Sequence, residues 1–151
     1  MVVVEVNGYT IEPAADLAGA DLEGADLGGE RLEFADLKGA NLKGANLIRA
    51  YLEGVDLQGA DLQGADLQGA CLSHGHLEGA NFEGANFEGA FFKRAFLQGA
   101  NLRGANLTRT NIAAGALLYG AIADERTIWP GPMGLGFGAF DPKAAGVDFD
   151  N

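Results

Sequence analysis

Apolar residues return at a fixed interval of five along most of this chain. From Ala15 onward every fifth position is Leu or Phe, and a small residue, usually Ala, stands two positions before it. The position between them is mostly Asp or Asn, and the unit usually closes with Gly, so the unit is Ala-(Asp/Asn)-Leu-X-Gly. The large apolar positions are Leu17, Leu22, Leu27, Leu32, Leu37, Leu42, Leu47, Leu52, Leu57, Leu62, Leu67, Leu72, Leu77, Phe82, Phe87, Phe92, Leu97, Leu102 and Leu107, and Ile112, Leu117 and Ile122 extend the series.

A period of five fits neither a helix nor a straight strand. Five residues turn an α-helix by about 500°, so successive Leu side chains would form no single apolar face. In a strand the Ala and Leu of one unit share a side, but the odd period sends the next Leu to the opposite side. Both conflicts disappear if the chain turns a corner once per unit, at the Gly. Each Ala–Leu pair then points inward, and stacked coils share backbone hydrogen bonds.

The exceptions to the repeat indicate four sides per coil. Departures from the Asp/Asn position and from the Gly corner recur in steps of twenty residues or multiples of twenty, and steps of fifteen are fewer. The Asp/Asn position is replaced at Arg31, Tyr51, Cys71 and Phe91, and again at His76, Phe96 and Ala116; the Gly corner is replaced at Phe34, His74, Arg94 and Ala114, and at Arg49 and Arg109.

The chain resembles the pentapeptide repeat family, as in the run Ala60-Asp61-Leu62-Gln63-Gly64-Ala65-Asp66-Leu67-Gln68-Gly69. Its tail resembles those of bacterial members, especially cyanobacterial ones. The resemblance covers residues 15 to about 124. It implies an all-β fold, a right-handed quadrilateral β-helix solenoid, which over this range would have about 5.5 coils. We expect residues 1–14 to form an N-terminal cap of strand and turn, 15–124 the β-helix, and 125–151 a C-terminal capping tail.

A solenoid needs covered ends, and both ends of this chain depart from the repeat. Val2 to Val6, Asn7-Gly8 and Tyr9 to Ile11 predict a strand, a tight turn and a second strand. The tail holds the only Trp of the chain and three Phe, of which the Trp and the first two Phe are expected to plug the last coil; docking elsewhere is the alternative. The three residues are Trp129, Phe137 and Phe140.

The net charge of −11 argues against direct nucleic-acid binding, which needs clustered Lys and Arg. Charge is uneven: residues 15–36 carry seven acids and one Arg, whereas residues 89–123 carry four basic residues and no acid. Glu30 occupies an inward position, so we expect it to turn to solvent or to pair with Arg31. A single Cys, no signal-peptide pattern and no apolar run long enough to span a bilayer predict a cytoplasmic protein.

No catalytic motif is present, and we expect neither enzymatic activity nor a cofactor. One cluster has ligand chemistry, Cys71, His74 and His76, but it lacks the spacing of a zinc motif. Metal or redox binding there is the weakest of the functional hypotheses. The glycines that recur every five residues are corners, not phosphate-binding loops.

Aromatic residues replace Asp or Asn in two adjacent outward columns, and such residues are typical of a protein-interaction site. The candidate partner-binding residues are Tyr51, Cys71, His74, His76, Phe91, Arg94 and Phe96. The leading hypothesis is a non-enzymatic scaffold or protein-interaction module with an unknown protein partner, a second copy of the chain included. Because the resemblance extends to family members that shield DNA gyrase by imitating acidic DNA, such a DNA mimic is the alternative. The basic coils and short rod count against it.

Overall fold

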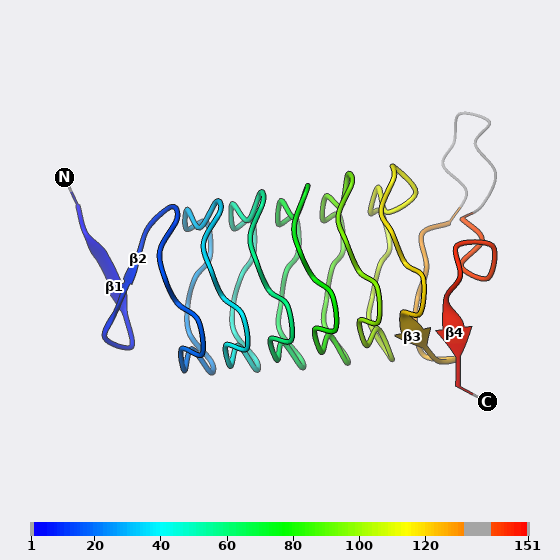
Figure 1. Ribbon diagram of the computed structural model, residues 1–151, viewed down its shortest axis with the longest axis horizontal. Coiled ribbons are helices and arrows are strands. Elements are labelled where there is room, and N and C mark those ends of the chain that lie inside the picture. Colours follow the sequence, from blue (N-terminus) through cyan, green and yellow to red (C-terminus); the bar gives the residue numbers. More distant parts are fainter. Residues whose placement is uncertain (1, 132–139, 151) are drawn as a thin grey trace.

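The computed structural model describes residues 2–131 and 140–150. The chain forms a rod of stacked coils, with a hairpin at the N-terminal end and a short two-stranded sheet at the C-terminal end (Figure 1). Strands β1 (Val4–Val6) and β2 (Tyr9–Ile11) form the hairpin, and β3 (Ile122–Ala123) and β4 (Asp148–Phe149) form the terminal sheet. Between these two sheets, single parallel bridges link the stacked coils. They join residues twenty apart, such as Asp61 and Asn81.

The bridges define four columns of outward residues, which we number by the residue that begins each column. Side 1 begins at Asp16, side 2 at Asp21, side 3 at Asp26 and side 4 at Arg31. Each column repeats after twenty residues, so the coil has the four sides that the spacing of exceptions predicts. A corner lies between each side and the next.

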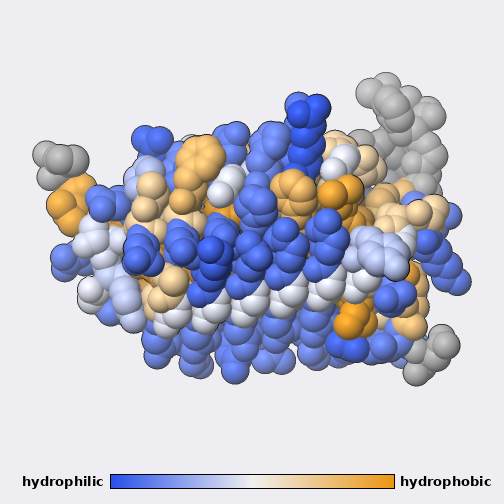
Figure 2. Space-filling model, viewed as in Figure 1, coloured by the Kyte–Doolittle hydropathy of each residue, from blue (hydrophilic) through white to orange (hydrophobic). Residues whose placement is uncertain are grey.

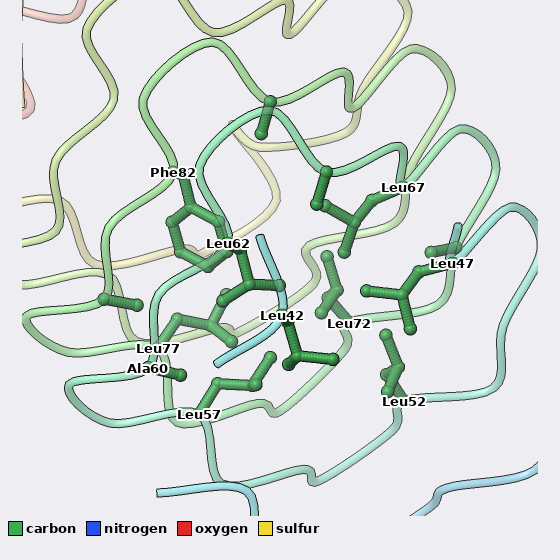
Figure 3. Close-up of a cluster of buried hydrophobic side chains, with 14 of the residues drawn as sticks. Leu42, Leu47, Leu52, Leu57, Ala60, Leu62, Leu67, Leu72, Leu77 and Phe82 are labelled. Atoms are coloured by element: carbon green, nitrogen blue, oxygen red, sulfur yellow. The ribbon is translucent and has the colours of Figure 1, made fainter. Parts of the chain in front are cut away.

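The core is a set of stacked Leu and Ala columns that run the length of the rod. Leu42, Leu62 and Phe82 lie one above another in side 2, and all three are fully buried (Figure 3). The inward Phe residues of one coil, Phe82, Phe87 and Phe92, meet edge to face with ring centroids 5.0 Å apart. Burial of each ring stabilises the fold by about 1.5–3 kcal/mol before entropy is counted.

Two repeat units that stack in neighbouring coils are joined by three backbone hydrogen bonds. For the units around Leu62, the Leu62 N–H donates to the Asn81 carbonyl at 2.7 Å and the Asn81 N–H donates to the Ala60 carbonyl at 2.9 Å. The corner Gly64 N–H donates to the Glu83 carbonyl at 2.9 Å. The Asp or Asn adds a fourth bond within the unit, because its side chain accepts the N–H two residues on, as Asp61 does from Gln63 at 3.1 Å.

The corners require a left-handed backbone, which explains the Gly in most units. Where Gly is absent the corner residue still adopts a positive φ, for example 60° at Phe34, 59° at His74 and 55° at Arg94. The ring of Phe34 leans over the next corner in its column, Gly54: a Cβ at Gly54 would lie 2.4 Å from Phe34 Cε1. Gly54 therefore has a second reason to lack a side chain.

The N-terminal residues form a hairpin in the structure. β1 and β2 pair antiparallel, with Val6 opposite Tyr9, and Asn7 and Gly8 have φ values of 52° and 81° as a type I′ turn requires. Ile11 is buried, and the Tyr9 hydroxyl accepts a hydrogen bond from the Asp21 N–H, which faces the open edge of the first coil. The hairpin thus packs against the N-terminal end of the core.

The predicted inward positions of Leu117 and Ile122 are wrong. Leu117 is 48% exposed and bridges Phe96, twenty-one residues away, whereas Leu118 is buried. The cause is one extra residue after Ile112, because Gly115 takes the corner at φ 82° in place of Ala114. Ala116, assigned outward from the sequence, accordingly holds the small inward position of a shifted unit that ends at Gly120.

The C-terminal tail returns to the last coil. β4 adds to β3 in parallel, with Ile122 opposite Asp148, and Val147 is buried. The Trp129 and Phe140 rings lie 5.4 Å apart and pack against the core; Phe137 lies outside the described residues. These contacts agree with the plug hypothesis for Trp129 and Phe140.

Of the two arrangements expected for Glu30, the ion pair with Arg31 does not form. Arg31 pairs with Glu33 at 3.0 Å instead, and Glu30 is half-buried beside Ile11 and Arg31 in a shallow groove under the hairpin. Glu33 lies two residues from Arg31 on the outward face of the same unit, whereas Glu30 occupies an inward position, and this explains the choice of partner.

Candidate protein-interaction surface

The outward column of side 4 contains no Asp. Tyr51 bridges Cys71, and Cys71 bridges Phe91, so the three lie in successive coils. Tyr51 is 53% exposed and Phe91 51% exposed, whereas the free thiol of Cys71 is half-buried between them. The aromatic rings therefore present large apolar areas to solvent.

Side 1 continues this surface in its C-terminal half. The His76 and Phe96 rings stack with centroids 4.9 Å apart and an interplanar angle of 3°. His76 Nδ1 lies 3.4 Å from a Glu78 carboxylate oxygen. Leu117 follows Phe96 in the column, so the side ends in an apolar stretch.

The corner between sides 4 and 1 joins the two columns. His74 and Arg94 occupy it, both exposed, as the sequence predicts. The structure thus places the seven predicted partner-binding residues on one surface made of two adjacent columns and the corner between them. Together with three further residues described next, we call it the aromatic surface.

Sequence reasoning missed three members of the aromatic surface: Phe34, Leu117 and Tyr119, which are 67%, 48% and 79% exposed. Phe34 was recognised as a replaced corner but not as part of the surface. Leu117 is placed inward by the apolar period, and Tyr119 lies in the same shifted unit. The spacing of Gly115 and Gly120, five residues apart, with Ala116 and Leu118 between them, is the signal that could have placed both.

Sides 2 and 3 are different because their outward columns form polar ladders. Asn81 donates to Asp61 at 3.1 Å, and Asn101 donates to Asn81 at 3.0 Å. Asn alternates with Asp in the N-terminal coils, so like charges are separated by an amide. Figure 2 shows apolar residues in an interrupted band on one part of the visible face, with many hydrophilic residues beside it.

The family model for pentapeptide repeats matches the chain in eight copies, over residues 15–54, 40–79 and 76–112. The chain belongs to the pentapeptide repeat family. The right-handed quadrilateral β-helix predicted from the resemblance is thereby confirmed.

Two solved pentapeptide repeat proteins are similar to this one. One, from the thylakoid lumen of Arabidopsis thaliana, is 38% identical with a TM-score of 0.63, and the match covers 64% of this chain and 68% of that chain. The other, Rfr23 from the cyanobacterium Cyanothece 51142, is 33% identical with a TM-score of 0.63, and the match covers 78% and 90%. No curated protein matches the chain.

The plasmid-mediated fluoroquinolone resistance protein QnrB1 is also similar, over 93% of this chain and 92% of that chain. The identity is 19% and the TM-score 0.45, so this likeness carries no argument about function.

This pentapeptide repeat protein does not gather its Cys and His residues into a metal-binding group. Cys71 points outward on side 4 and His76 on side 1, with His74 at the corner between them. Within residues 2–131 and 140–150, no group of three or more His, Cys, Asp or Glu side chains is placed to hold a metal ion. In the same ranges no helix is long and apolar enough to cross a membrane.

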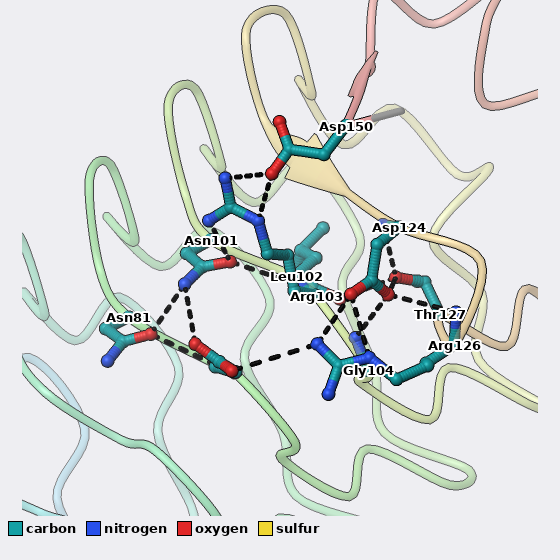
Figure 4. A network of polar contacts seen from close by, with 10 residues as sticks. Asn81, Asn101, Leu102, Arg103, Gly104, Asp124, Arg126, Thr127 and Asp150 are labelled. Atoms are coloured by element: carbon teal, nitrogen blue, oxygen red, sulfur yellow. Dashed lines mark hydrogen bonds and ion pairs between the residues drawn. The ribbon is translucent and has the colours of Figure 1, made fainter.

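The basic C-terminal coils are largely neutralised by nearby acids (Figure 4). Arg103 pairs with Asp150 of the tail, and Arg109 pairs with Glu88 at 3.4 Å. Burial opposes ionisation of Asp124, but hydrogen bonds from Arg126 and from the Gly104 N–H lower the pKa of its carboxyl below the ordinary value. Lys93 and Arg94, by contrast, have no ion-pair partner in the described part of the chain; Arg94 belongs to the aromatic surface, and Lys93 lies beside it.

Acid predominates at the other end of side 1, where Asp16, Asp36 and Asp56 stack in successive coils. Lys38 lies between two of them, 3.2 Å from Asp56 and 4.0 Å from Asp36. The hydrogen bond to Asp56 and the two negative charges raise the pKa of Lys38 above its ordinary value. The aromatic surface is thus bordered by unpaired cations at one end and by acids at the other.

Proposed function

We propose that this protein is a non-enzymatic interaction module that binds a protein partner through the aromatic surface. The observation that carries the proposal is the gathering of aromatic rings on side 4, side 1 and the corner between them, whereas the outward columns of sides 2 and 3 are polar as far as Asn101 and Asn106. Exposed apolar residues scattered singly need no explanation, but a contiguous patch rimmed by charge is typical of an interaction site.

The rigidity of the platform supports this proposal. Tyr51 and Phe91 stand on backbone held by hydrogen bonds to both neighbouring coils, as when the Cys71 N–H donates to the Ala50 carbonyl at 3.0 Å. A surface of this kind loses little conformational freedom on binding, and aromatic rings offer a large contact area for few rotatable bonds.

The distribution of acids supports interaction over DNA mimicry. The net charge of −11 favours a mimic. Duplex DNA, however, carries one charge per about 1.7 Å of its axis. On side 2, acids at Asp21 and Asp61 stand two coils apart with Asn41 between them, a spacing of roughly 10 Å. The ladder is therefore too sparse in charge to match a phosphate backbone.

The test is a pull-down with the double variant Phe91→Asn and Phe96→Asn. Both changes restore the repeat, so the melting temperature should stay within a few degrees of wild type. The matched control, Gln63→Ala with Gln68→Ala, alters exposed residues on sides 2 and 3. We expect the proteins retained by the wild type and by the control to be lost with the Phe variant.

Retention of the same proteins by all three forms would refute the proposal. Retention of gyrase by both the wild type and the Phe variant would favour the DNA mimic instead.

A further inference from the structure

Side 4 has two adjacent columns of side chains, and both are centred on the coil that contains Cys71. The outward column runs Tyr51, Cys71, Phe91, and the column next to it, at the X position of each unit, runs Glu53, Ser73, Lys93. Cys71 and Ser73 belong to the middle coil. The coils on either side of it are complementary. Tyr51 and Phe91 are both aromatic, and Glu53 is an acid where Lys93 is a base.

This arrangement is complementary to its own image under a two-fold rotation. Consider an axis that lies along the strand direction of side 4 and passes through the Cys71 coil. It reverses the order of the coils and keeps each column facing the same column. Tyr51 then faces Phe91 of the second copy, and Glu53 faces Lys93 of the second copy. Isologous interfaces require this kind of self-complementarity.

We propose that side 4 pairs with side 4 of a second copy of this chain, antiparallel, with Cys71 at the two-fold axis. The proposal rests on the proposed function, since it names one partner of the aromatic surface. The part of that surface on side 1, which contains Phe96 and Leu117, stays open for a different protein.

The charges that would pair across the axis are free within one chain. Glu53 and Lys93 are exposed, and neither has an ion-pair partner among the described residues. They stand two coils apart, roughly 10 Å, which is too far for them to pair with each other. Two identical Glu53–Lys93 contacts would form in the dimer.

The corner supplies a third match. Arg94 would face Gly54 of the second copy, and the Phe34 ring lies over that glycine, as its 2.4 Å approach to the missing Cβ shows. A guanidinium over an aromatic face is a favourable contact. The dimer therefore gives Arg94, which has no ion-pair partner in the described chain, a ring to pack on.

Sides 1 and 2 are not complementary to themselves under the same two-fold rotation. On side 2, Lys43 and Glu83 would face each other across an axis at Asp61, but two Asp61 carboxylates would then meet, and Lys43 already pairs with Asp61 at 3.4 Å. On side 1 the corresponding axis brings two Asp56 side chains together, and Lys38 is engaged with Asp56 at 3.2 Å. Like charges placed directly opposite one another oppose association.

The size of the surface predicts a weak dimer. Three coils at about 4.8 Å each give a strip roughly 14 Å long. A strip of this length and of one side's width falls at the lower end of specific interfaces, where association is transient. Dimerisation should accordingly depend on protein concentration.

The experiment combines sedimentation over a range of protein concentrations with cross-linking by a short bis-maleimide, which joins two thiols. Cys71 is the only cysteine, so a covalent dimer reports two Cys71 side chains close together. We expect the wild type to dimerise and to cross-link, and Cys71→Ser to sediment as wild type without cross-linking.

Charge reversal makes the test specific. Glu53→Lys and Lys93→Glu each turn two attractive contacts into two repulsive ones, and each should weaken dimerisation about tenfold or more. The double variant Glu53→Lys with Lys93→Glu restores both contacts and should regain wild-type association. Lys43→Glu, with the same charge change at the same repeat position on side 2, is the control and should dimerise as wild type. Thermal melts confirm that each variant is folded.

A wild type that sediments as a monomer throughout, or single variants that dimerise as well as the wild type, would overturn the proposal. Failure of the double variant to recover would do the same. None of these outcomes bears on the pull-down with Phe91→Asn and Phe96→Asn, because capture of a different protein through side 1 would still respond to Phe96.

Discussion

Replacing Gly54 by Ala tests how a bulky corner residue is accommodated, and Gly59 provides a matched control. Both glycines have a φ of 64°, so Ala meets the same backbone strain at each, about 1–2 kcal/mol. A Cβ at Gly59 meets open space. A Cβ at Gly54 would lie 2.4 and 2.5 Å from two carbons of the Phe34 ring, so the ring has to move.

The extra cost at Gly54 follows from what Phe34 loses. The ring is 67% exposed, so about a third of its surface is covered, mainly by this corner. Full burial of a Phe side chain is worth about 1.5–3 kcal/mol, which puts the lost part at about 0.5–1 kcal/mol. Gly54→Ala should therefore cost about 0.5–1 kcal/mol more free energy of unfolding than Gly59→Ala.

The assay is urea denaturation of both variants, alone and in a Phe34→Ala background, analysed as a double-mutant cycle. Phe34→Ala keeps the positive φ at residue 34 and removes only the ring. In that background the two Gly→Ala costs should become equal. Equal costs in the wild-type background, or a difference that persists without the ring, would refute the placement of Phe34 over Gly54.

Two further predictions concern the core and the C-terminal ion pairs. Leu62→Asp should unfold the chain, because a carboxylate at this fully buried position has no partner, whereas Gln63→Asp, one residue on and exposed, should not; a circular dichroism melt of Leu62→Asp close to wild type would contradict the inward assignment. The folded-state pKa of Asp124 lies below its ordinary value of 3.8, so its contribution to stability is complete above that value and is lost as the pH falls through the lowered pKa. Between about pH 5 and 2, wild-type stability should therefore fall more steeply than that of Asp124→Asn in urea titrations, and parallel curves would argue against the Asp124–Arg126 interaction.

Most of the fold could be predicted because one period governs both the core and the corners. Leu62 and Gly64 each recur at fixed positions, so burial and backbone conformation repeat together, and the twenty-residue exceptions set the number of sides. The prediction failed where the two signals separate. After Ile112 the apolar period continues to Leu117, but the residue that tolerates a positive φ is Gly115, one position late. The corner determines the register there, because Gly115 adopts the positive φ without strain and Leu118 fills the inward position in place of Leu117.

The candidate surface could be predicted only in part. Its columns follow from the twenty-residue repeat, which places Tyr51, Cys71 and Phe91 in line. The directions of side chains do not follow from any period. The Phe34 ring over Gly54 and the pairing of Arg31 with Glu33 depend on side-chain conformations that the sequence pattern does not specify.

Side 4 lacks stabilising hydrogen bonds that an Asp or Asn in its outward column would accept. This loss of stability argues against neutral variation as the origin of the aromatic surface. On sides 2 and 3 the Asp or Asn accepts the N–H two residues on, as Asn81 does from Glu83 at 3.2 Å. The corresponding N–H groups of Glu53, Ser73 and Lys93 find no side-chain acceptor among the described residues, because Tyr51, Cys71 and Phe91 cannot accept in that way. A hydrogen bond of this kind contributes about 0.5–1.5 kcal/mol, so three successive coils forgo a few kcal/mol in one column. Stability alone would favour Asp or Asn at each of these positions, and binding is what would favour the rings.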